Sequence, residues 1–94
     1  MKHHIIVKWN DKVTDRTELL KEVEELFSSA GRADGVEGVS LIPNCVDRPN
    51  RYDLMIVLEM EKEDLPVWDG SPVHREWKEK YGDLVLSKAI FDCE

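Results

Sequence analysis

The sequence of 94 residues contains only two cysteines, Cys45 and Cys93. A chain of this composition with so few thiols is not built on a disulfide framework. Neither cysteine has a histidine beside it in the sequence that would activate it as a nucleophile. Because the opening Met1–His4 leads straight into a strand pattern, we also expect no signal peptide. The scarcity of cysteine therefore predicts a cytoplasmic, reducing location.

Positive charge is also scarce, since 13 Lys and Arg stand against 20 Asp and Glu, a formal net charge of −7. The basic residues are scattered along the chain and form no cluster. Nucleic acids and anionic lipids are bound through concentrated positive charge, so we expect neither as a partner. Apolar runs are short as well, and none approaches the roughly 20 residues of a membrane-spanning helix.

Motifs that hold metals or phosphates are missing. The sequence has no HxxxH or CxxC spacing, and the side chains of His3 and His4 diverge if that segment is a strand. Gly31, Gly35 and Gly38 do not form a phosphate-binding loop. We therefore expect no metal and no cofactor. The length suits one hydrophobic core, so we expect a single domain over residues 1–94.

What the sequence does contain is alternation of apolar and polar residues, which predicts four strands. Their expected ranges are His3–Trp9, Val36–Asn44, Tyr52–Met60 and Leu84–Asp92. The first and third strands carry apolar groups on both faces, which is typical of inner strands covered on both sides. Pro43 interrupts the hydrogen-bonding pattern of the second strand and favours an edge position or a bulge.

Two longer helices are predicted between these strands. Asp15 can cap a helix that carries Glu18 three residues later and an apolar stripe from Leu19 to Ala30, with Gly31 as its expected end. Ser71 and Pro72 are typical of a cap and first position, and that helix is expected to run to Tyr81 and stop at Gly82. A short helix is possible between Asp64 and Gly70.

The order β-α-β-β-α-β predicts an α+β fold of the ferredoxin-like type, a four-stranded antiparallel sheet with helices on one face. The second sheet face would then expose a large apolar patch. A second copy packing sheet to sheet would cover that patch. We therefore expect a homodimer through sheet-to-sheet packing, with a barrel-like core between the two sheets.

Three segments, considered in order, resemble the stress-responsive α/β-barrel (Dabb) family. They are HHIIVKW at 3–9, RYDLMIVLE at 51–59 and SPVH at 71–74. The resemblance covers almost the whole chain and implies the ferredoxin-like fold and the dimeric α/β barrel. One plant member of the family cyclises a polyketide without metal or organic cofactor, in a pocket between sheet and helices. The resemblance therefore implies a small hydrophobic or aromatic ligand.

Aligned by eye with that cyclase, two histidines are kept and two polar groups are not. Its helix histidine falls on His74 and its first-strand histidine on His3. Its catalytic tyrosine falls on Trp68, which can donate a hydrogen bond but has no phenolic proton. Its third-strand histidine falls on Leu54.

His74 is the leading catalytic candidate, because an imidazole serves as acid or base near neutral pH. Its alternative role is to hold the helix entry by a local hydrogen bond. His3 is the second candidate, and its alternative is a hydrogen-bonded histidine at a strand end. Ligand-binding candidates are Trp68, Tyr52, Trp9 and Leu54, and each is alternatively a core or surface residue. Lys88 either serves an anionic ligand or discourages pairing at a strand edge.

Two functions stay open on the sequence alone. The first is a poorly defined Dabb-like homodimer that binds a small hydrophobic or aromatic ligand. The second is a cofactor-independent cyclase or isomerase that acts on a polyketide-like or aromatic acid, with His74 as general acid and base. A third and weaker alternative, a haem- or quinol-handling oxygenase, follows only from related barrels that share the fold.

Overall fold

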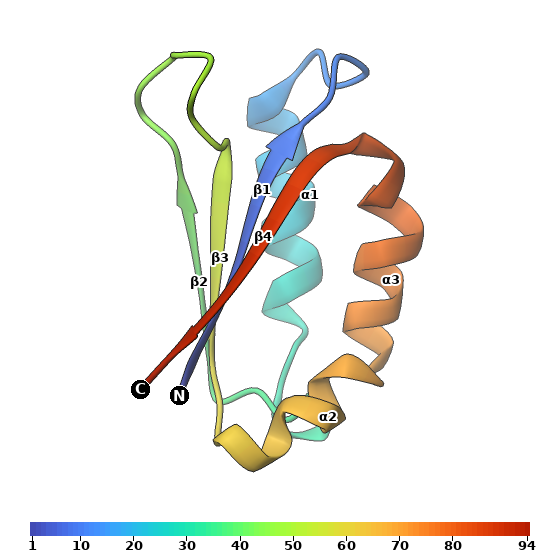
Figure 1. Ribbon diagram of the computed structural model, residues 1–94. Helices are drawn as coiled ribbons and strands as arrows, with labels where there is room; N and C mark the ends of the chain where they lie inside the picture. Colours follow the sequence, from blue (N-terminus) through green and yellow to red (C-terminus); the bar gives the residue numbers. More distant parts are fainter.

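The computed structural model describes residues 1–94 as one four-stranded sheet with three α-helices (Figure 1). Short 3₁₀ turns precede β2, α2 and β4. In chain order the elements are β1 (Lys2–Trp9), α1 (Arg16–Ser28), β2 (Gly38–Pro43), β3 (Leu54–Glu59), α2 (Leu65–Asp69), α3 (Pro72–Tyr81) and β4 (Val85–Cys93). None of these helices has both the length and the apolar character needed to cross a membrane.

The sheet is antiparallel with the strand order β2-β3-β1-β4, which confirms the predicted ferredoxin-like α+β fold. β1 and β3 are the inner strands, as the apolar character of both their faces predicts. β2 is an edge strand, where a proline without a backbone N–H is tolerated because one side of the strand has no partner to pair with. β4 forms the other edge and places the end of the chain beside its beginning.

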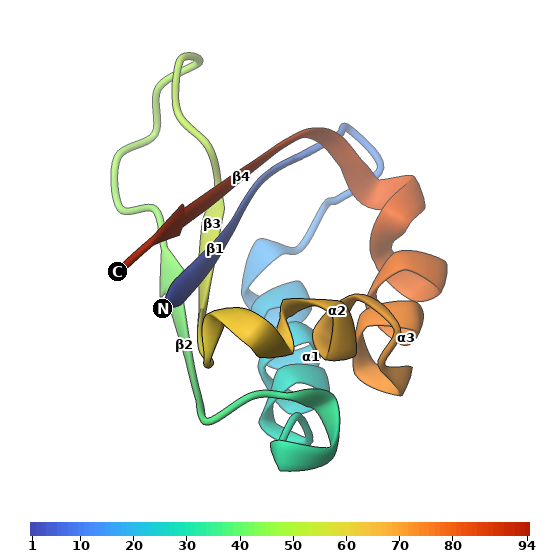
Figure 2. The ribbon, with the colours of Figure 1, turned by 60° about the horizontal axis from the view of Figure 1, so that its bottom comes forward.

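All three helices lie on one face of the sheet (Figure 2). α1 buries Leu19, Val23 and Phe27 against the strands. α3 buries Val73, Trp77 and Tyr81 in the same layer. Alternate residues of the inner strands complete this core, while the residues between them face away from the helices.

The helix starts follow the predicted caps. A carboxylate oxygen of Asp15 accepts a hydrogen bond from the Glu18 N–H at 3.0 Å, and Ser71 Oγ accepts one from the His74 N–H at 3.2 Å. The predicted end of α1 at Gly31 is wrong. The helix ends at Ser28 because the Ser29 N–H already closes on carbonyls of the last turn, and Gly31 instead begins the 3₁₀ turn before β2.

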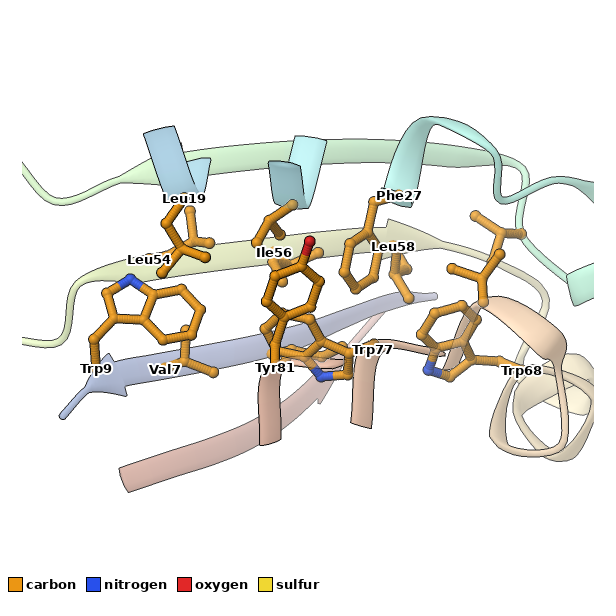
Figure 3. Packing of buried hydrophobic residues seen from close by; sticks show 14 of the residues in the cluster. Val7, Trp9, Leu19, Phe27, Leu54, Ile56, Leu58, Trp68, Trp77 and Tyr81 are labelled. Carbon is orange, nitrogen blue, oxygen red and sulfur yellow. The ribbon is translucent and has the colours of Figure 1, made fainter. Parts of the chain in front are cut away.

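Aromatic side chains fill the space between sheet and helices (Figure 3). The ring of Trp77 lies 6.2 Å from that of Trp9 and 5.4 Å from that of Phe27, both close to edge-on. Phe27 in turn lies 5.9 Å from Trp68. Such pairs add specific geometry to the burial of large apolar surfaces.

Two polar atoms of this core lack a hydrogen-bond partner, Trp68 Nε1 and the Tyr81 hydroxyl. Burial away from water raises the pKa of the Tyr81 phenol above 10.0, because the charged form is poorly solvated there. An unsatisfied buried donor costs free energy. Burial of the apolar parts of both rings between the sheet and the helices offsets this cost.

Candidate functional site

His3 forms an ion-pair contact with the last strand of the sheet. The register of β1 and β4 sets His3 directly opposite Asp92, and His3 Nδ1 lies 2.5 Å from Asp92 Oδ1. The histidine is only 6% exposed. Because an ionised carboxylate can only accept, the His3 Nδ1–H donates this bond and Nε2 is left for another partner.

His74 is held in a similar way from the first turn of α3. Its ring Nδ1 lies 2.8 Å from the backbone carbonyl oxygen of Asp69, the last residue of α2. A carbonyl can only accept, so Nδ1 must carry the proton and the Nε2 lone pair of the neutral ring is free. The ring of Trp68 packs 5.1 Å from the imidazole and supports it from the core side.

The two histidines line one cavity of about 250 Å³ between β1, β4, α2 and α3, which we call the histidine cavity. Its apolar walls are Ile5, Leu65, Trp77 and Ile90. Its polar lining consists of His3, Asp69, His74, Lys88 and Asp92. The two histidines that the sequence offers as catalytic candidates therefore line the same cavity. Sequence reasoning singled out neither Asp69 nor Asp92.

Trp68 does not line the histidine cavity as a ligand-binding residue would. Its side chain is fully buried, with 0% exposure, and packs between Phe27 and His74. Its place in the sequence led us to expect a ligand contact, because a catalytic tyrosine stands there in the plant cyclase. The larger indole is instead used to fill the core behind His74.

Trp9 and Leu54 do not line the histidine cavity either. They line a second cavity of about 320 Å³ at the other end of β1, beside the start of α1. The buried Asp53 carboxylate there accepts a hydrogen bond from the Trp9 N–H at 2.7 Å and pairs with Arg16 at 3.0 Å. These charges are satisfied within the protein and tie β1, β3 and α1 together, and no histidine is present.

Tyr52 lies on the opposite side of the sheet. Its hydroxyl is 3.3 Å from Ser87 Oγ, and its ring borders a shallow groove with Ile6 and Met55. The four predicted ligand-binding residues therefore do not share one pocket. Aromatic residue type indicated a pocket, but only strand register tells which face and which end of the sheet each ring occupies.

No group of three or more His, Cys, Asp and Glu side chains gathers in a way that could hold a metal ion. The histidine cavity holds two imidazoles, but His3 is engaged with Asp92 and His74 with a backbone carbonyl. What the arrangement can do chemically is to accept and donate protons at two Nε2 atoms next to apolar walls.

No family model matches the sequence, and none of the curated proteins is similar to it. Solved structures are similar in fold. A dimeric ferredoxin-like protein of unknown function from Thermobifida fusca superposes with a TM-score of 0.78 at 16% identity, covering 96% of this chain and 85% of that one. A Dabb family protein with a ferredoxin-like fold from Mesorhizobium loti gives 0.74 at 10% identity, covering 99% and 93%.

An enzyme is among the similar structures as well. The hydroxynitrile lyase of Passiflora edulis gives a TM-score of 0.75 at 8% identity, covering 96% of this chain and 87% of that one. At sequence identities this low, similarity to solved structures establishes the fold alone. The chain therefore has the ferredoxin-like α+β fold of Dabb-type proteins, and the resemblance found in its sequence is confirmed at that level.

The Asp69–His74 bond allows the structural role of His74 to be separated from its chemistry. His74→Ala removes the bond and part of the packing on Trp68, so we expect it to lower the free energy of unfolding by about 1 kcal/mol. His74→Asn keeps an N–H near the position of Nδ1 and should restore most of that loss. Urea unfolding at equal protein concentration measures both. An alanine variant as stable as the wild type would show that the bond contributes nothing.

Proposed function

We propose that the protein binds a small hydrophobic or aromatic molecule in the histidine cavity. The observation that carries this proposal is that two imidazoles with free Nε2 atoms and four apolar side chains line one space of about 250 Å³. A dry cavity of about 150 Å³ is enough to hold benzene in another protein. The histidine cavity therefore has room for a single substituted ring, and its five polar lining residues can orient that ring.

A second candidate function is acid–base catalysis at the same cavity. The observation in its favour is the hydrogen bond that fixes His74 with its proton on Nδ1, so that Nε2 can take a proton from a bound molecule. His3, whose Nδ1 is engaged by Asp92, can exchange a proton with the bound molecule at its Nε2.

The reaction class that suits two such groups is proton removal next to a carbonyl. His74 takes the proton from carbon, the electron pair moves into the carbonyl to form an enolate, and the proton returns to a different atom or the carbon attacks a second carbonyl. These steps give an isomerase or a cyclase and need neither metal nor redox cofactor. The Passiflora edulis lyase supports the idea that this fold can carry catalysis.

The binding proposal is tested by titrating the protein with single-ring aromatics, benzamide first, while the imidazole signals are followed by NMR. We expect the His3 and His74 signals to shift together and saturate. His4 is a built-in control, because it lies on the other face of the sheet and bonds the Phe91 carbonyl. A folded protein whose His3 and His74 signals never move with any ring of the series would contradict the proposal.

The catalytic candidate is tested with a 1,3-dicarbonyl compound such as pentane-2,4-dione in deuterated water. We expect the protein to accelerate exchange at the acidic carbon, and His74→Asn to lose this acceleration by roughly 10²- to 10⁴-fold. His4→Asn is the matched control and should keep the rate. Full activity in His74→Asn would exclude His74 as the base.

We also propose that two copies pair through the face of the sheet that no helix covers. Strand register puts Ile6, Met55, Val57, Ala89 and Phe91 on this face. Phe91 is 60% exposed and Ile42 is 51% exposed. An apolar surface of this kind on a small protein is typical of an association site. The Thermobifida fusca protein of the same fold is described as dimeric, which supports this assembly.

Phe91→Asp tests the assembly, because it places a charge on the exposed apolar face proposed as the interface. We expect the wild type to be a dimer and Phe91→Asp to be a monomer at micromolar concentration in light scattering. Ala33→Asp, on an exposed turn away from the sheet, adds the same charge and should remain a dimer. A wild-type monomer, or a dimer unaffected by Phe91→Asp, would refute sheet-to-sheet pairing.

A further inference from the structure

Lys88 is the one residue with a permanent positive charge among those that line the histidine cavity. The register of β4 sets it opposite Val7, on the face of the sheet that the helices cover. Its neighbours on that face, Ile5, Val7 and Ile90, are apolar. Lys88 is itself exposed, as is Ile90, so its ammonium lies where the cavity opens to solvent.

No carboxylate of the protein lies within ion-pair distance of this ammonium. The two ion pairs of the structure are His3–Asp92 and Arg16–Asp53, and Lys88 belongs to neither. The Asp92 carboxylate, which lines the same cavity, accepts its hydrogen bond from His3. The Asp69 side chain also lines the cavity but forms no ion pair, and only its backbone carbonyl is engaged, by His74.

We propose that Lys88 makes the histidine cavity selective for ligands that carry a carboxylate next to an apolar ring. This inference rests on the proposed ligand-binding function and names the chemical class of the ligand. The ring is held by apolar walls such as Ile5 and Trp77, and the carboxylate pairs with the Lys88 ammonium at the mouth of the cavity. Charge-assisted hydrogen bonds of this kind are stronger than neutral ones.

A lysine on an edge strand also discourages pairing with other strands, and β4 is an edge strand. Such a protective role depends on the charge of Lys88 but not on the charge of a ligand. The two roles therefore differ in one measurable quantity, the ratio of affinities for a charged and a neutral ligand of the same shape. Benzoate and benzamide form such a pair.

The experiment measures Kd for benzoate and benzamide from the His3 and His74 imidazole signals, in the wild type and in variants. We expect the wild type to bind benzoate about tenfold more tightly than benzamide, an advantage of the size found for hydrogen bonds to charged groups. The advantage should disappear in Lys88→Met, persist in Lys88→Arg, and shrink as salt is added. Asp69→Asn, which removes a negative charge from the same cavity, should increase it.

Lys78→Met is the matched control, since Lys78 is exposed on α3 and does not line the cavity. It should leave both affinities unchanged. Equal binding of benzoate and benzamide by the wild type, or a preference that survives in Lys88→Met, overturns the role of Lys88 while leaving the ligand-binding function intact. Absence of binding for both molecules overturns the two proposals together.

Discussion

The pairing register of β1 with β3 and β4 decides which side of the sheet each of its residues faces. Ile5 and Val7 are almost completely buried under the helices, and their burial favours one register strongly. Since side chains alternate with a period of two, a slip of one residue would bring His4 into the cavity and send His3 to the opposite face. The packing of aliphatic side chains therefore selects which of two adjacent histidines meets Asp92 and His74.

Most of the fold could be predicted because its signals are local. Asp15 and Ser71 cap their helices through bonds to residues three positions away, so the sequence nearby contains the information. Ends of elements were less predictable. α1 stops before Gly31, and β3 is shorter than the apolar pattern around it. A strand ends where its neighbours stop pairing with it, and that depends on segments elsewhere in the chain.

The candidate site was predictable only in part. His3 and His74 could be singled out, because a histidine that opens a strand and a histidine in the first turn of a capped helix are both visible in the sequence. Asp92 could not be found in this way, since it stands 89 positions from His3 and no spacing rule connects them. Tyr52 and Trp9 were chosen by residue type and Leu54 by alignment, but they occupy the other face or the other end of the sheet.

The contact between His3 and Asp92 joins the first strand of the sheet to the last. During synthesis on the ribosome, β1, α1, β2 and β3 emerge first and can pair among themselves, whereas β4 follows after α3. Contacts of such long sequence separation form late and slowly. In a growing chain His3 therefore has no carboxylate partner until the final strand has emerged and joined the sheet.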